Sequence, residues 1–148
     1  MVRAPNSRYP RWVANDALVQ SIKEIVGRAK DGDVDGSYRG YRDLFSSAEF
    51  AAYPVEDQRQ ALKLMILKQG VTATADCIDA HRAALDRLTA LVSSHNEPAD
   101  FELLGICHVV VGDEESASNV FKAALAIERE RDPSSPLCGA LMKRVSML

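Results

Sequence analysis

Three aspartates in a short glycine-containing stretch are the residues of this sequence most suggestive of chemistry. Asp31, Asp33 and Asp35 alternate with other residues in DGDVDG and could offer oxygen ligands to Ca²⁺, with Gly36 making the sharp turn of a calcium loop. Such a loop also needs a bidentate acid at its twelfth position, which is Arg42 here. We therefore interpret residues 31–36 as a polar turn between two helices, and keep a calcium-responsive binding protein as an alternative.

Cysteine and histidine pairs are the second candidate for metal chemistry. Cys77 and His81 are four residues apart, and Cys107 and His108 are adjacent, which places the latter two about 100° apart on a helix. No Cys-x-x-Cys pair is present. We expect no metal and no cofactor, and we expect the three cysteines, with Cys138 as the third, to be reduced core residues of a cytoplasmic protein.

Motifs of catalysis are missing from the sequence. It contains no glycine-rich phosphate loop, no Gly-x-Ser-x-Gly and no His-Glu-x-x-His, so we expect no enzyme activity. A net charge of −3 gives no general attraction to nucleic acid, and no apolar run approaches the roughly 20 residues that span a bilayer. We expect neither nucleic acid nor a membrane as partner. Residues 1–12 carry Arg3, Arg8 and Arg11 without an apolar run, which indicates a flexible arm rather than a secretory signal.

The elements that must position these residues are helices. Apolar residues recur at three- and four-residue intervals through most of the chain, and glycine, proline and aspartate interrupt the pattern. The pattern predicts one all-α domain over residues 1–148 with seven helices. The first helix ends at about residue 30, and the second begins at 36 or 37. The third covers about 55–68 and the fourth about 75–93. The last three cover 99–111, 115–132 and the residues from Pro136 onward.

A weak internal repeat organises these helices. Gly32, Gly70 and Gly112 are separated by 38 and 42 residues, and each is expected in the short turn of a helix pair. Spacings of this size are typical of stacked antiparallel helical hairpins. The sequence thus predicts about three helix pairs and a C-terminal capping helix.

The last pair has the clearest pattern, FELLGICHVVVGDEESASNVFKAALAIERERDP. Gly105 and Ala117 allow two helices to approach closely, and Phe121 fills the space beside them, with Ala124 three residues on. This unit resembles a tetratricopeptide repeat. The first pair keeps the spacing of Gly32, Tyr41 and Leu44 but has Ile25 at the small position. The register of residues 55–93 stays open.

The resemblance implies a superhelix that binds another protein or peptide on its inner face. We therefore expect a non-catalytic interaction module or scaffold with an apolar groove lined by the partner-binding residues Leu64, Leu67, Glu102, Ile106, Val109 and Val110. The alternative is a homodimer or structural subunit in which the terminal helix covers this groove through Leu137, Leu141, Met142 and Val145.

Overall fold

The computed structural model describes residues 16–148, so the expected arm at 1–12 and its three arginines lie outside the described residues. The regular elements of residues 16–148 are all helices, with no strand, which confirms the predicted all-α class. Its helices are α1 (Asp16–Lys30), α2 (Val34–Ser46), α3 (Ala48–Ala52), α4 (Val55–Ile66), α5 (Ala75–His95), α6 (Pro98–Val110), α7 (Glu114–Arg131) and α8 (Pro136–Ser146). None of them is both long and apolar enough to cross a bilayer.

The short helix α3 is the element that the periodicity missed. Its five residues are too few to show a helical repeat of apolar positions. Ser47 begins the helix, because its hydroxyl oxygen accepts a hydrogen bond from the Glu49 N–H. Phe50 is fully buried and packs edge-on against Phe45 of α2, with ring centroids 5.1 Å apart. Thus α3 anchors the connection between α2 and α4.

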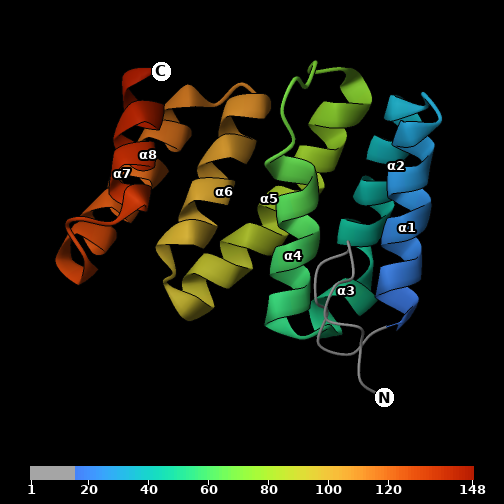
Figure 1. Ribbon diagram of the computed structural model, residues 1–148, viewed down its shortest axis with the longest axis horizontal. Helices are drawn as coiled ribbons and strands as arrows, with labels where there is room; N and C mark the ends of the chain where they lie inside the picture. Colours follow the sequence, from blue (N-terminus) through green and yellow to red (C-terminus); the bar gives the residue numbers. More distant parts are fainter. Residues whose placement is uncertain (1–15) are drawn as a thin grey trace.

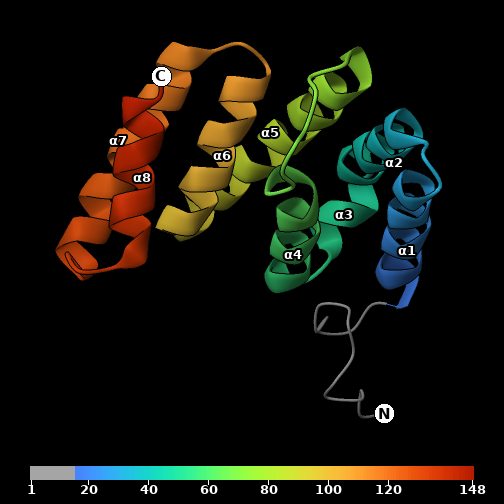
Figure 2. The same ribbon diagram turned by 45° about the horizontal axis from the view of Figure 1, so that its top comes forward.

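The helices form an elongated row from α1 at one end to α7 and α8 at the other (Figures 1 and 2). The principal packed pairs are α1 with α2, α2 with α5, α5 with α6, α6 with α7 and α7 with α8. A smaller contact joins α4 to α6. One apolar cluster extends from α1 to α6, and a second one lies between α7 and α8.

Two of the hairpins have the same turn, 80 residues apart (112 − 32 = 80). Gly32 and Gly112 have φ values of +91° and +88°, which favour glycine. Each following aspartate accepts a hydrogen bond from the backbone N–H three residues later, at 2.9 Å for Asp33 and 3.1 Å for Asp113. Sequence and geometry therefore repeat together at the α1–α2 and α6–α7 turns.

The two hairpins achieve close helix contact in opposite ways. In the α6–α7 hairpin, Gly105 of the first helix lies against the ring of Phe121, which is 1% exposed. In the α1–α2 hairpin the bulky residue, Ile25, is on the first helix and Gly40 is on the second. A Cβ at Gly40 would lie 2.7 Å from Ile25 Cγ1, so each hairpin needs its glycine for close packing.

The expected hairpin around Gly70 is not observed. Gly70 has a φ of +70°, but it belongs to an eight-residue connection, 67–74, and α5 packs along α2 and α6 rather than along α4. Arg59 of α4 instead reaches Asp100 of α6, with Nη2 2.8 Å from Oδ2 and Nε 3.0 Å from Oδ1. Asp100 is 1% exposed, so this paired and buried carboxylate fixes α4 beside α6.

Candidate functional site

An open apolar groove lies between α1 and α4, and residues of α2 also line it. We call it the α1–α4 groove, and its cavity volume is about 190 Å³. Its lining comprises Val26 and Ala29 of α1, Ser37, Tyr38 and Tyr41 of α2, Leu64 and Met65 of α4, and Lys68 just after α4. An engineered apolar cavity of about 150 Å³ binds benzene, so this groove has room for one large side chain of a partner.

The groove exists because α1 and α4 are held by different neighbours. Helix α1 packs on α2, whereas the Arg59–Asp100 ion pair draws α4 to α6. Tyr41 and Met65, which are 6% and 1% exposed, are fixed by packing at its base. The groove is therefore preformed by well-packed helices.

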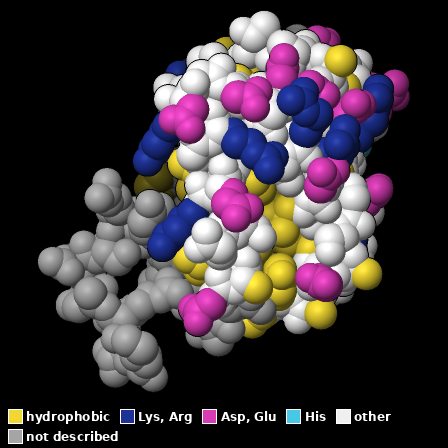
Figure 3. Space-filling model, turned by 90° about the vertical axis from the view of Figure 1, so that its right-hand side faces the viewer, with side chains coloured by type: hydrophobic (Ala, Val, Ile, Leu, Met, Phe, Trp, Pro, Cys, Tyr) yellow, Lys and Arg dark blue, Asp and Glu magenta, His cyan; other side chains and the backbone are white. Residues whose placement is uncertain are grey.

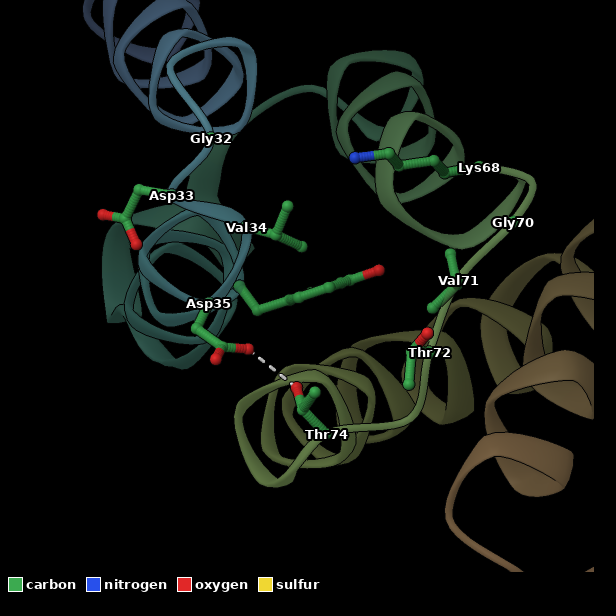
Figure 4. A pocket seen from close by; sticks show the side chains of 10 residues that line it. Gly32, Asp33, Val34, Asp35, Lys68, Gly70, Val71, Thr72 and Thr74 are labelled. Atoms are coloured by element: carbon green, nitrogen blue, oxygen red, sulfur yellow. Dashed lines mark hydrogen bonds between the residues drawn. The ribbon is translucent and has the colours of Figure 1, made fainter.

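A second cavity continues the groove toward the helix ends. We call it the loop pocket; its volume is about 410 Å³, and its lining is Gly32, Asp33, Val34, Asp35, Tyr38, Lys68, Gly70, Val71, Thr72 and Thr74. Tyr38 and Lys68 line both cavities. The α1–α2 turn and the 67–74 connection form opposite walls of the pocket (Figure 4).

The charged groups of the loop pocket point in different directions. Lys68 extends from its backbone into the pocket toward Val34, whereas Asp33 is directed away from it (Figure 4). Asp33 caps α2, and Asp35 Oδ1 accepts a hydrogen bond of 2.8 Å from the Thr74 hydroxyl. The ammonium group of Lys68 is thus directed into the pocket, while both carboxylates already accept hydrogen bonds from the protein.

A buried polar cluster lies next to Tyr38. The His81 ring stands 6.0 Å from the Tyr38 ring, and His81 Nδ1 is 2.7 Å from the Cys77 carbonyl oxygen. A carbonyl can only accept, so Nδ1 carries the hydrogen. Burial raises the pKa of the Tyr38 hydroxyl and of the Cys77 thiol, and it lowers the pKa of His81. All three groups are therefore kept neutral, and a neutral, fully buried thiol is a poor nucleophile.

The expected partner-binding residues are divided between two places. Leu64 lines the α1–α4 groove, and Leu67, three residues later, is 44% exposed. The other four belong to α6: Glu102, Ile106 and Val110 are partly buried, and Val109 is 40% exposed. The α1–α4 groove thus contains Leu64 from the expected set and none of the α6 residues in its lining.

The terminal helix covers part of the α6 surface. Arg144 Nε of α8 donates to Glu102 Oε2 at 2.8 Å. Leu137, Leu141 and Val145 pack in the α7–α8 cluster, which also contacts Ile106, whereas Met142 is 51% exposed. Helix α8 thus contacts Glu102 and Ile106 of the expected set, Val109 stays exposed, and the lining of the α1–α4 groove includes no α8 residue.

Residues 31–42, which were weighed as a calcium loop and interpreted as a turn, have other contacts. Arg42 pairs with its neighbour Asp43 at 3.0 Å, and Asp33 and Asp35 are engaged as described above. Within residues 16–148, no group of three or more acidic, cysteine or histidine side chains could hold an ion. The geometry gives the calcium alternative no ligand set in this part of the chain.

Most of the groove was missed by sequence reasoning. Tyr41 was noted only for its spacing from Gly32, Tyr38 was not singled out, and residue 68 was only the end of the helix predicted over about 55–68. A signal was present in the two tyrosines, because such amphipathic side chains often lie where a buried surface meets solvent. Their position beside α4 could not be read from the sequence, because it depends on α4 pairing with α6.

A further hollow lies at the outer end of the row, over α1 and α2. Its volume is about 300 Å³, and charged residues of both signs, Glu24, Arg28, Asp43 and Glu49, border it. Figure 3 views this end, where hydrophobic side chains are exposed among acidic and basic ones. The mixed charge makes it a less distinctive site than the α1–α4 groove.

Comparison of the chain with protein-family models, with curated proteins and with solved structures finds no match. The geometry and chemistry of the α1–α4 groove are therefore the basis for a functional proposal.

Proposed function

We propose that the protein is a non-catalytic interaction module, a scaffold of stacked helical hairpins similar to tetratricopeptide repeats, which binds a short segment of another protein in the α1–α4 groove. The observation that carries this proposal is the continuous opening formed by the groove and the loop pocket, with Tyr38 and Lys68 common to both. Its apolar part offers burial, and its polar end offers hydrogen bonds, the combination that a peptide segment requires.

The similarity to tetratricopeptide repeats is supported by the two hairpins with matching turns. Gly105, Ala117 and Phe121 are all buried at the α6–α7 contact, as the repeat pattern expects. The middle of the chain departs from that pattern, because α4 packs on α6 and not along α5. This departure opens the space between α1 and α4, so it supports a binding role for that space.

The energetics suit a reversible interaction. Burial of one large apolar side chain contributes about 1.5–3 kcal/mol, and neutral hydrogen bonds add about 0.5–1.5 kcal/mol each. The groove holds one such side chain, so further contacts along the loop pocket are required for a stable complex. We expect modest affinity and rapid exchange.

The test is a groove-filling substitution, Ala29→Trp, with Ala123→Trp as the matched control. Ala29 lines the groove on α1, whereas Ala123 is exposed on α7. Displayed random peptides would be selected on the full-length protein, and the enriched peptides titrated calorimetrically against all three proteins. We expect Ala29→Trp to abolish binding and Ala123→Trp to retain it; equal binding by both variants, or no enriched peptide, would refute the proposal.

A misfolded Ala29→Trp variant would also lose binding, so a second measurement uses the unmodified protein. Peptide titration followed by backbone amide NMR should shift resonances of α1, α2 and residues 64–74. Shifts confined to α7 and α8 would contradict the proposed site. Light scattering, with and without peptide, would reveal the alternative of a homodimer, in which a second copy and not a different protein fills the groove.

A further inference from the structure

The charged residues that border the α1–α4 groove indicate the chemistry of its partner. Within the groove lining, the charged residue is Lys68, which is exposed. Lys30 is also exposed and follows Val26 by four residues, which places it on the same side of α1 as that lining residue. Both long borders of the groove therefore carry a lysine.

Acidic residues of the same helices are directed elsewhere. Glu24 precedes Val26 by two residues, so it lies about 200° around α1 from the groove side. Glu56 of α4 receives a hydrogen bond from Arg59, 2.8 Å away. Neither Lys30 nor Lys68 takes part in any of the ion pairs observed within residues 16–148.

The exposed aspartates Asp31, Asp33 and Asp35 lie in or next to the α1–α2 turn, and two of them line the loop pocket, whereas the lining of the α1–α4 groove contains no acidic residue. Asp33 caps α2 and is directed away from the loop pocket, and Asp35 accepts the hydrogen bond of Thr74 (Figure 4). An acidic group of a partner can pair with the Lys68 ammonium group, which lies beside the apolar lining.

We infer that the α1–α4 groove recognises an acidic peptide segment that inserts one large apolar side chain between Val26 and Leu64 and places carboxylates against Lys30 and Lys68. This inference rests on the proposed function and specifies the chemistry of the partner. The apolar side chain supplies most of the binding free energy, because exposed ion pairs are weak individually. The carboxylates select the partner and its orientation, since charge complementarity acts mainly on specificity.

The test is a charge reversal with designed probes. Three peptides share one central leucine or phenylalanine and are flanked by glutamate, by glutamine or by lysine; each is titrated by fluorescence anisotropy against the full-length protein. The variants are Lys30→Glu with Lys68→Glu, and Lys122→Glu as the matched control, because Lys122 is an exposed lysine on α7.

We expect the wild-type protein and the Lys122→Glu variant to prefer the glutamate peptide, with a contribution of up to about fivefold in Kd per ion pair at low salt. The double reversal should invert the order and favour the lysine peptide, and added salt should reduce both preferences. The same order of peptides in the double variant and the wild type would overturn the inference. If all three peptides bind equally in the groove, the inference of an acidic partner is refuted while the proposed function stands. If none of them binds, the inference and the proposed function are both refuted.

Discussion

Replacement of Gly105 by alanine tests the closest helix contact of the fold. A Cβ at this position would lie 2.6 Å from Phe121 Cδ1 and 2.7 Å from Phe121 Cζ. Alanine is favoured over glycine in a helix by about 1 kcal/mol, whereas overpacking of a filled core costs about 1–3 kcal/mol. Because the Phe121 ring is 1% exposed and packed, the overpacking should prevail. The difference between the two contributions is a net loss of up to about 2 kcal/mol in the free energy of unfolding.

Gly139 provides a matched control for that substitution. It also lies inside a helix, α8, but an added Cβ would meet nothing within 4 Å. Gly139→Ala should therefore stabilise the protein by about 0.5–1 kcal/mol through helix propensity alone. Urea denaturation would measure both variants, and thermal melting should move by about 2–4 °C for each kcal/mol.

The sign of the Gly105 effect decides the outcome. If Gly105→Ala stabilises as much as Gly139→Ala does, the ring and the α6 backbone are not in contact and the packing account is wrong. A double-mutant cycle with Phe121→Leu adds a second criterion. The smaller side chain should relieve the crowding, so Gly105→Ala should be less harmful in that background, with a coupling of about 0.5–3 kcal/mol.

Three further predictions concern buried polar groups. Asp100→Ala should lower the free energy of unfolding by about 3 kcal/mol or more, because it leaves Arg59 without its buried partner; a urea denaturation curve like that of the wild type would contradict this. Burial lowers the pKa of His81, so the unfolded chain takes up a proton first as the pH falls. The stability linked to neutral His81 is therefore fully present above about pH 6.5 and is lost below it; unfolding curves of the wild type and His81→Gln should diverge there, and parallel curves would refute the linkage. Burial raises the pKa of Cys107 to about 12, so alkylation at neutral pH should be slow until urea unfolds the chain, and mass spectrometry that detects rapid labelling of native Cys107 would disprove its burial.

The helices could be predicted because their signals are local. Apolar residues three and four apart marked the long helices, and Pro98 and Pro136 begin α6 and α8 near the expected places. Gly32 and Gly112 marked two turns, because a positive φ leaves a recognisable glycine in the sequence. Local conformation and capping chemistry were therefore readable from neighbouring residues.

The arrangement of the helices was not readable in the same way. Gly70 has a positive φ like the other two glycines, yet α4 pairs with α6 through Arg59 and Asp100, which are 41 residues apart. A contact at that separation leaves no periodic pattern. The candidate site depends on it, since the groove is the space that α4 leaves beside α1. This is why Leu64 was anticipated while Tyr41 and Lys68 were not.

The opposite placement of bulky and small residues in the two hairpins has a consequence for folding fidelity. Ile25 and Gly105 each precede their turn glycine by seven residues, so if α1 docked on α7 in place of α6, Ile25 would meet the Phe121 ring. The two turns are alike, yet α1 cannot take the place of α6 against α7. Shape therefore disfavours the pairing of α1 with α7, both within one chain and between two copies of a chain with a repeated architecture.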